Sequence, residues 1–397
     1  MSKGILHGIK VLDLTRVLAG PYSSMLLADM GAEVIKIEVP TKGDDTRAFG
    51  PFINGESAYY MNLNRNKKGI TLNLKTEEGR TLFLEMVKKS DVVLENYRPG
   101  TMEKLGLGYE TLKEINPGIV YGCVSGFGHY GPYSQRAGYD IIGQAMGGLM
   151  STTGWPGGEP TRTGTAMGDV LGGLSVTIGV LAAVINKIKT GEGQKVDVAL
   201  VDSVVSSLEI INQIYLATGR IPERIGNRYE STYPYDSFRV KDGSIVIACG
   251  NDKLFSILAN EMGQPELTED SRFTRNIDRV NNHAPLKEII EKWSINHTID
   301  ELVEKLLDLG IPTAPINTID RVVKDPHIAG ARKMFVEVDH PVAGKVKITG
   351  DHIKFNELKS EIRTPSPTLG QHNYEVYSEL FGLSKEQIQE LKEKMII

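Results

Sequence analysis

The sequence contains only two cysteines among its 397 residues. Cys123 and Cys249 lie far apart and form neither a disulfide framework nor a metal-ligand spacing. The opening stretch, "MSKGILHGIKVLDL", has neither the apolar core nor the cleavage site of a signal peptide. We therefore expect no bound metal and a cytoplasmic location, and the composition disfavours the disulfide-rich secreted classes.

Runs of like charge and long apolar runs are also scarce. The chain has 45 basic and 50 acidic residues, giving a net charge of −5 without a basic block, so we expect no nucleic-acid partner. The uncharged run Val170–Asn186 is close to the lower length limit for a membrane span. Because it contains Gly172, Gly173 and Gly179, we expect a buried helix in close contact with a neighbour, and no membrane partner.

The dinucleotide fingerprint is missing as well. The N-terminal strand–helix–strand pattern and Glu38 have the layout of a nicotinamide-binding unit. The loop in the phosphate position, however, reads "TRVLAGPYSS" and has a single glycine instead of G-x-G-x-x-G. Backbone approach to a pyrophosphate needs those glycines, so the sequence disfavours this class.

Short apolar strands alternate with helices over the first 125 residues. The stretches read as strands are "IKVLDLT", "AEVIKIE", "GITLNLK", "DVVLEN" and "GIVYGCVSG", with "QKVDVALV" further on. This alternation predicts an α/β fold with a Rossmann-like parallel sheet. Ligands bind such sheets beyond the carboxyl ends of the strands, where the loops "TRVLAGP", "ENYRPG" and "SGFGHYGPYSQRAGYD" would lie.

The pattern changes after the sixth strand. Asp242-Gly243 between two strand-like runs predicts a hairpin, and amphipathic stretches follow it. The sequence therefore divides into a large α/β domain over 1–206, a linker over 207–227, a smaller α+β domain over 228–325 and a return to the large domain over 326–397.

One carboxylate, Asp169, stands at the start of the most apolar segment, in "TRTGTAMGDVLGGL". Asp is a favoured N-cap residue, so the simplest interpretation is that Asp169 caps the helix that follows. The alternative is chemical: beside an apolar helix a carboxylate loses hydration and becomes a better nucleophile. This segment alone leaves both interpretations open.

Several motifs in order along the chain resemble the class III CoA-transferases, the family of formyl-CoA transferase and carnitine CoA-transferase. They are "GIKVLDLTRVLAGPYSSMLLADMGAEVIKIE", "GDDTR", "NRNKKGITLNLKT", "ENYRPG", "GYD", "GDVLGG" and "LGQHN". The resemblance implies an enzyme in which Asp169 is the nucleophile, forming first a mixed anhydride and then an aspartyl-CoA thioester. It also implies an interlocked-ring homodimer, acyl-CoA and a small carboxylic acid as substrates, and no permanently bound cofactor.

The same resemblance implies the CoA contacts. The matching positions are Val17, Leu18, Ala19, Leu72, Asn73, Leu74, Lys75, Asn96, Tyr97, Arg98, Lys104 and Tyr139. Arg47, Arg98 and Lys104 suit phosphate because their side chains pair well with its oxygens. Gly147, Gly148 and Gly168 suit an oxyanion hole, since glycine backbone N–H groups are accessible.

Three departures from formyl-CoA transferases bear on the substrate. Val39 replaces an arginine that meets the nucleotide, Leu18 replaces a glutamine beside the active site, and "CGNDK" replaces a glycine run in the small domain. These differences disfavour formate and oxalate as the substrate pair. We expect a dicarboxylyl-CoA such as succinyl-CoA, with a short hydroxy or branched acid left open.

Two alternatives remain at this point. The family also contains α-methylacyl-CoA racemase, which needs two proton-transfer groups. Related racemases have histidine at the position of Tyr139, and tyrosine is a poor base near neutral pH. His129 could serve only if its loop folded inward. A non-catalytic acyl-CoA-binding module would keep the CoA loops without the nucleophile, whereas Asp169 is present.

Overall fold

The computed structural model describes residues 4–358 and 360–397 and divides the chain into two compact units. The first unit comprises residues 1–149, 162–219 and 326–397, and the second comprises 150–161 and 220–325. The division differs in two places from the one drawn from sequence. Residues 150–161 group with the second unit, and the expected linker contains helix α10 (Glu209–Thr218) of the first unit.

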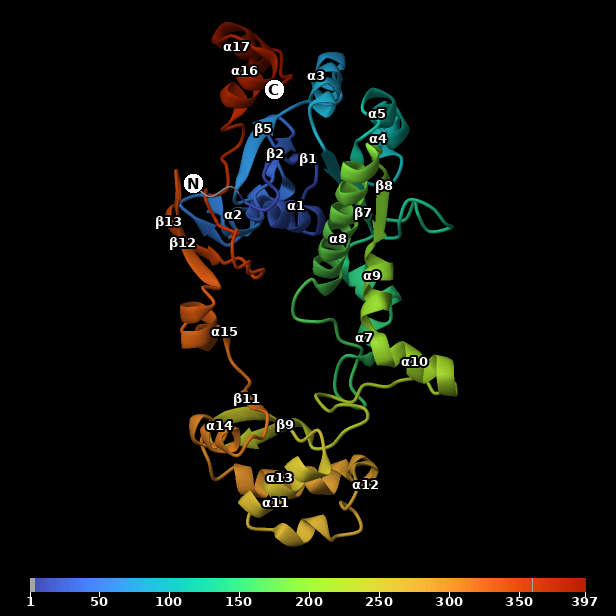
Figure 1. Ribbon diagram of the computed structural model, residues 1–397, viewed down its shortest axis with the longest axis vertical. Coiled ribbons are helices and arrows are strands. Elements are labelled where there is room, and N and C mark those ends of the chain that lie inside the picture. Colours follow the sequence, from blue (N-terminus) through green and yellow to red (C-terminus); the bar gives the residue numbers. More distant parts are fainter. Residues whose placement is uncertain (1–3, 359) are drawn as a thin grey trace. The chain divides into compact units, whose positions relative to one another are not determined.

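A six-stranded parallel sheet forms the centre of the first unit (Figure 1). In spatial order its strands are β5 (Lys67–Thr71), β2 (Glu33–Glu38), β1 (Lys10–Asp13), β6 (Val92–Glu95), β7 (Val120–Ser125) and β8 (Lys195–Ala199). All neighbouring pairs are parallel. The predicted α/β class and all six predicted strands are confirmed.

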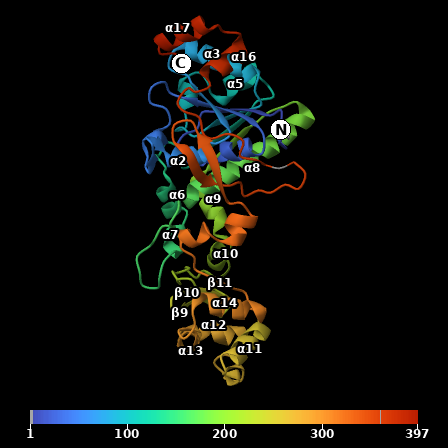
Figure 2. The same cartoon turned by 90° about the vertical axis from the view of Figure 1, so that its left-hand side faces the viewer.

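Alternate residues of each strand enter two different cores. Val11 and Val92 face one core, whereas Leu12 and Val93 face the other. The first core contains helices α1 (Ala19–Asp29), α8 (Met167–Thr190) and α9 (Leu200–Ser207). The second contains α3 (Glu77–Lys88), α5 (Tyr109–Ile115), α16 (Asn373–Phe381) and α17 (Lys385–Glu393), which Figure 2 shows together at one end of the unit. The sheet is thus the middle layer of three.

Shorter elements complete the first unit. They are a 3₁₀ turn at Asp45–Ala48, β3 (Phe52–Ile53), β4 (Glu56–Ser57), α2 (Ala58–Leu63), α4 (Thr101–Lys104), α6 (Asp140–Met146), α7 (Leu149–Thr152), β12 (Phe335–His340) and β13 (Gly344–Thr349). Strands β12 and β13 form an antiparallel pair, and Val346 packs on Met61 of α2. Helix α7 begins at the last residue of a first-unit segment.

The second unit has an antiparallel sheet in the order β11 (Thr313–Pro315), β10 (Gly243–Ala248) and β9 (Tyr235–Val240). Strands β9 and β10 form the hairpin predicted at Asp242-Gly243. The helices of this unit are α11 (Asp252–Glu261), α12 (Asn276–Asn281), α13 (His283–Ser294), α14 (Ile299–Asp308) and α15 (Ile319–Val322). The buried guanidinium of Arg279 donates to Asp252 Oδ1 at 2.6 Å and to the carbonyl of Tyr233 at 2.8 Å.

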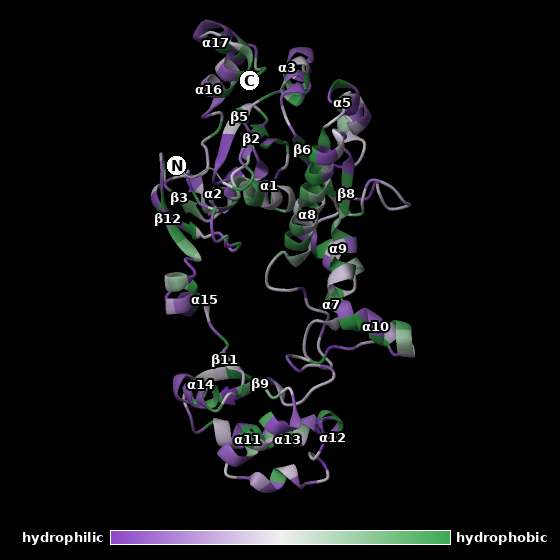
Figure 3. Ribbon diagram, viewed as in Figure 1, coloured by the Kyte–Doolittle hydropathy of each residue, from purple (hydrophilic) through white to green (hydrophobic). Residues whose placement is uncertain are grey.

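Helix α8 is the most apolar long helix of the first unit, as its colour in Figure 3 shows. By length and composition it could cross a membrane, and α9 with α10 would pass the same test as one bent span. One face of α8 is instead buried against α1, β7 and β8, as its glycines predict. The helix ends at Gly191, which has φ +81° and donates its N–H to the carbonyl of Lys187.

Candidate active site

A pocket of about 390 Å³ lies beyond the carboxyl ends of β1, β6 and β7. It is lined by Arg16, Val17, Leu18, Ala19, Asn96, Tyr97, Arg98, Pro99, Thr101, Val124, Ser125, Gly126, Arg136, Ala137, Gly138, Tyr139, Asp169 and Leu200. All three loops that the sequence assigns to this edge contribute to the lining, together with the start of α8. The pocket belongs entirely to the first unit.

Asp169 is not the N-cap of α8. The N-cap is Ala166, without a side-chain hydrogen bond, and Asp169 is the third residue of the helix. The carboxylate that satisfies the first turn belongs to Asp140, whose Oδ1 accepts from the N–H of Gly168 at 2.8 Å and from that of Asp169 at 3.4 Å. The capping interpretation is therefore wrong, because another carboxylate performs that function.

Asp140 is one of the residues of this site that the sequence analysis missed, although its motif "GYD" is present. It is buried as the first residue of α6, and its Oδ2 accepts from Gln144 Nε2 at 2.8 Å. Arg162 lies 3.8 Å from the same oxygen. An N–H acceptor supplied by a different helix leaves no signal in the local sequence of α8.

The surroundings of Asp169 disfavour its charge. Burial, together with the nearby charge of Asp140, raises the pKa of Asp169 to about 7. Burial and the charge of Asp169 in turn raise the pKa of Tyr59 to about 12, so this neighbour keeps its phenolic proton. Near neutral pH the site therefore contains a poorly solvated carboxylate that is easily protonated, beside a neutral hydroxyl.

The glycines of "GDVLGG" let other backbones approach α8. A Cβ on Gly168 would lie 3.1 Å from Asp140 Oδ1, and one on Gly173 would lie 2.7 Å from the carbonyl oxygen of Ala19. A Cβ on Gly172 would lie 2.6 Å from Leu200. Small residues at these positions thus bring the amino end of α1 and the start of α9 close to the turn that carries Asp169.

The loop before α1 has an unusual backbone. Val17 has φ +69°, which is a strained conformation for a β-branched residue. Its N–H donates to Asp44 Oδ1 at 3.2 Å, and Asp44 Oδ2 accepts from the buried Lys36 Nζ at 2.8 Å. Burial would raise the pKa of Asp44, but the charge of Lys36 outweighs it and holds that pKa well below its usual range. A buried ion pair therefore holds Val17 in place.

The second loop is fastened to the first. Asn96 Oδ1 accepts from the N–H of Arg16 at 2.9 Å, and its Nδ2 donates to the carbonyl of Arg16 at 2.6 Å. Helix α1 begins at Ala19 with no side-chain cap at Leu18 and no acidic residue in its first turn. An uncapped helix N-terminus attracts anions, so phosphate or carboxylate groups are favoured at this side of the pocket.

The cationic residues that line the pocket differ in part from those expected from the sequence. Arg98 lines it, whereas Lys104 lies at the exposed end of α4 outside the lining. Arg47 is committed elsewhere: it forms two 2.7 Å bonds to Glu38 and stacks over the ring of Tyr60. Arg16 and Arg136 line the pocket and were missed, although both stand in loops that the sequence assigns to this edge.

The expected contacts over 72–75 are also outside the lining. Leu72 is buried in the core, and Leu74 packs against that core. The N–H of Asn73 donates to the carbonyl of Ile396, and Lys75 is exposed. Apart from Lys75, these side chains serve the packing of the C-terminal segment.

The three glycines expected to form an oxyanion hole have their N–H groups engaged. Gly147 donates to the carbonyl of Gly143 at 2.8 Å, and Gly148 donates to that of Ala145 at 3.4 Å. Gly168 donates to Asp140. These interactions hold helix ends together, so the expected donors are not available in this arrangement.

Tyr139 and His129, the two residues considered for racemase chemistry, lie in different surroundings. Tyr139 lines the pocket and is 74% exposed, as the N-cap residue of α6. The side chain of His129 is only 8% exposed and lies between Glu95 and Lys195, outside the lining. The loop has therefore folded His129 into the protein and not toward Asp169.

Comparison with known proteins agrees with this geometry. The family model described as CoA-transferase family III matches residues 6–373. Human succinyl-CoA:glutarate CoA-transferase is 40% identical over 97% of this chain and 88% of its own. Acetyl-CoA:oxalate CoA-transferase of Acetobacter aceti is 41% identical over 89% of this chain and 90% of its own.

Among solved structures, a CAIB/BAIF family protein from Brucella suis matches with a TM-score of 0.86 and 40% identity. The match covers 96% of this chain and 100% of that one. Sequence and fold agree over nearly the whole length. The chain is therefore an enzyme that belongs to CoA-transferase family III.

Proposed function

We propose that this enzyme transfers CoA from an acyl-CoA thioester to a short carboxylic acid through covalent intermediates on Asp169. The observation that carries the proposal is the position of Asp169: a poorly solvated carboxylate, relieved of capping by Asp140, in a pocket beside an uncapped helix N-terminus. Desolvation of this kind makes a carboxylate a stronger nucleophile.

The reaction begins when a carboxylate oxygen of Asp169 attacks the thioester carbonyl. The C–S bond breaks, CoA leaves as a thiolate, and a mixed anhydride remains. The thiolate then attacks the aspartyl carbonyl and expels the first acid as its carboxylate, leaving an aspartyl-CoA thioester. The acceptor carboxylate attacks this thioester and displaces CoA thiolate. That thiolate finally attacks the acceptor acyl carbon, which gives the new acyl-CoA and restores Asp169 without a net change in protons.

The pocket supports this sequence in three ways. The N-terminus of α1 and the side chains of Arg98 and Arg136 favour anionic groups, as CoA phosphates and carboxylates are, whereas Arg16 is paired with Asp45 at 3.0 Å. The proposed CoA contacts are the lining residues Val17, Leu18, Ala19, Asn96, Tyr97, Arg98 and Tyr139. Tyr59 supplies a neutral hydroxyl near the reacting carboxylate.

For the acids, we propose a dicarboxylyl-CoA such as succinyl-CoA as donor. The name of the human relative pairs succinyl-CoA with glutarate and supports this donor, whereas the name of the Acetobacter relative pairs acetyl-CoA with oxalate and supports only a dicarboxylic acid as the second substrate. Arg98 and Arg136, which line the pocket, suit ligands with additional negative charge. A matrix of acyl-CoA donors against short acids, read by mass spectrometry, tests this assignment, which fails if no C4 to C6 dicarboxylate reacts in either direction.

The decisive experiment compares Asp169→Asn with Asp202→Asn. Both residues are the third of their helices, α8 and α9, and neither N-cap residue forms a side-chain hydrogen bond. Asp169→Asn should lower kcat by at least about a thousandfold, or about 4 kcal/mol of barrier. Asp202→Asn should retain the wild-type rate, because Asp202 is exposed outside the pocket.

Wild-type enzyme incubated with acyl-CoA should also gain the mass of CoA less water on the peptide that contains Asp169. Borohydride should reduce this thioester and inactivate the enzyme. Near-normal turnover by Asp169→Asn, after a check for deamidation, would exclude the mechanism. Rapid deuterium exchange at the α-carbon of a 2-methylacyl-CoA would instead favour racemase chemistry, which the burial of His129 disfavours.

A further inference from the structure

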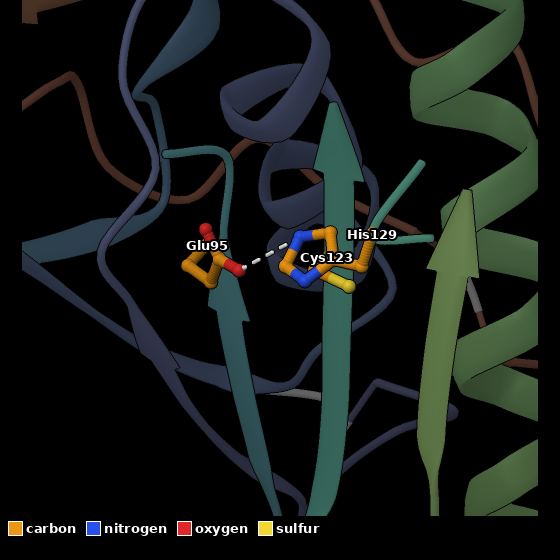
Figure 4. A group of neighbouring side chains, drawn as sticks. All are labelled: Glu95, Cys123 and His129. Atoms are coloured by element: carbon orange, nitrogen blue, oxygen red, sulfur yellow. Dashed lines mark ion pairs between the residues drawn. The ribbon is translucent and has the colours of Figure 1, made fainter. Parts of the chain in front are cut away.

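A cluster of titratable side chains lies on the other face of the sheet from Asp169, directly beneath the pocket loops. Glu95 is the last residue of β6, Cys123 belongs to β7, and His129 lies on the loop that follows β7 (Figure 4). One potential ligand atom from each lies within 4.8 Å of the others. The proposed mechanism uses none of the three.

The hydrogen bonds of His129 disfavour a metal at this cluster. Its Nδ1 lies 3.0 Å from Lys195 Nζ, a group that can only donate, so Nδ1 accepts and the ring proton is on Nε2. Nε2 faces Glu95 Oε1 at 3.5 Å and has no closer partner. A protonated nitrogen cannot ligate a metal, and the ammonium group of Lys195 would repel one.

The same geometry joins the two main pocket loops. Glu95 Oε2 accepts from the N–H of Tyr97 at 2.7 Å, which fixes the loop that carries Asn96 and Arg98. On the other side, the backbone N–H of His129 donates to Asp197 Oδ2 at 2.9 Å, which fixes the loop that leads to Tyr139. The pair Glu95–His129 therefore bridges the loops on both sides of the pocket.

We propose that Glu95 and His129 are positioning residues for CoA: an ionised Glu95 accepts from Tyr97 N–H and attracts the polar Nε2–H of His129, which lies 3.5 Å from Glu95 Oε1 without forming a hydrogen bond, and this holds the two loops at the separation that CoA binding needs. This inference rests on the proposed CoA pocket. Neither side chain lines that pocket, so both act through Asn96, Arg98 and Tyr139.

Protonation of Glu95 would disturb the bridge. Tyr121 Oη lies 3.2 Å from Glu95 Oε1, so a proton on Oε1 would meet two potential donors, Tyr121 and His129. Burial raises the pKa of Glu95 to about 7, although the N–H of Tyr97 and the hydroxyl of Tyr121 act in the other direction. Burial and then the charge of Lys195 lower the pKa of His129, which favours its neutral ring.

Other charged and titratable groups surround the pair. Burial and the charge of Glu95 raise the pKa of the Cys123 thiol, which stays protonated, and those of Tyr97 and Tyr121 are raised chiefly by burial. Glu103 of α4, with Lys195 and Asp197 of β8, also lies near enough to act on the pair electrostatically. Glu95 is therefore the group whose charge changes, and CoA should bind more weakly as pH falls through 7.

The test measures CoA affinity directly, by titration calorimetry, in the Asp169→Asn background, which removes the titration of the nucleophile. Between pH 6 and pH 8 the apparent dissociation constant should fall about tenfold, since only the ionised fraction of Glu95 is competent. Adding Glu95→Gln should give weak binding at both pH values and remove this tenfold contribution, leaving only a further change of about twofold from titration of the CoA phosphate, which is also present in the parent. Adding the exposed Glu110→Gln of α5 is the matched control and should leave the tenfold change intact.

Substitutions of His129 separate positioning from general structure. His129→Gln retains an N–H near the position of Nε2 and should keep most of the affinity at pH 8, whereas His129→Ala should lose about tenfold. The same dependence in Glu95→Gln as in its parent, or equal affinities for the Gln and Ala variants, would overturn the proposal while leaving Asp169 chemistry untouched. Stoichiometric zinc in the purified wild-type protein would overturn it in favour of a metal site.

Discussion

At the scale of single residues, the carboxylates of Asp140 and Asp169 have different roles at the start of α8. Asp140 accepts the N–H groups of the first turn, and this leaves Asp169 without a capping task. The sequence around Asp169 leaves capping and catalysis both open, and only the family resemblance predicts a nucleophile at this position. It does not predict Asp140, since the partnership joins residues 28 positions apart through tertiary structure.

The raised pKa of Asp169 predicts the pH dependence of turnover. Because burial and Asp140 raise this pKa to about 7, the nucleophile is increasingly protonated as pH falls below 7. We expect kcat, measured with both substrates saturating, to fall about tenfold per pH unit on the acid side. In Asp140→Asn, which keeps an oxygen for the N–H of Gly168, the midpoint should move to lower pH. A flat profile, or a midpoint that moves upward in Asp140→Asn, contradicts this assignment.

The same shift predicts an effect on stability with a definite sign. A folded-state pKa of about 7 against an unfolded value near 3.8 means that the folded protein binds this proton more tightly. The ionised carboxylate therefore destabilises the fold progressively as pH rises from about 4 to 7. Asp169→Asn should raise the free energy of unfolding by about 1–3 kcal/mol at pH 8 and leave it almost unchanged near pH 4. Denaturant titrations at the two pH values measure this difference, and a loss of stability at pH 8 would contradict it.

Lys36 supports the pocket from within the core. Lys36→Met would leave Asp44 buried without its cation, which costs about 3–5 kcal/mol, and would loosen the acceptor that holds Val17. We expect a lower midpoint of thermal unfolding and a raised KM for acyl-CoA. The double variant Lys36→Met with Asp44→Asn should recover part of the stability, because it removes the stranded charge. Equal losses in the single and double variants would show that the ion pair has no such role.

At the scale of elements, the predictable part of the fold follows from alternation. Each central strand is apolar on both faces, so the sequence reveals it without knowledge of its neighbours. The surroundings of residues 72–75 could not be predicted for the opposite reason: Asn73 donates its N–H to Ile396 of the C-terminal segment, more than 300 positions away, and the CoA contacts expected here stay a prediction. No local pattern reports such a partner.

The glycines of α8 link element packing to the pocket. Gly173→Ala would place a Cβ 2.7 Å from the backbone oxygen of Ala19, so α1 and the loop before it must shift. We expect CoA affinity to fall several-fold, about 1 kcal/mol, with the protein still folded. Gly179→Ala is the matched control, because its Cβ would meet a side chain of Val196, away from the pocket lining. If both variants change stability alike and neither changes CoA affinity, the close approach at Gly173 serves packing only.

At the scale of the whole molecule, the domain boundaries predicted from the sequence differ from the boundaries of the compact units. They differ where contacts, and not local composition, decide which unit a segment joins. The segment over 150–161 has loop-like composition, and only its contacts assign it to the second unit. Helix α10 occupies nearly half of the expected linker because its apolar residues favour a helix there. Four chain crossings, and not a single linker, connect the two units.

The first unit exposes large apolar side chains on α8 and α10. From this surface we predict that the enzyme is an intertwined homodimer. Ile178, Ile185 and Ile188 of α8 are 68%, 54% and 73% exposed, and Leu216 of α10 is 71% exposed. Burying one such side chain contributes about 1.5–3 kcal/mol, so a second copy covering this face would be held firmly. Sedimentation at nanomolar concentration should therefore show dimers and no monomer. Ile185→Glu should yield monomers or aggregates, whereas Lys189→Glu, which also introduces a negative charge on an exposed residue of α8, should remain dimeric. A wild-type monomer that dissociates freely at nanomolar concentration would exclude intertwined chains, since such chains cannot separate without unfolding part of their structure.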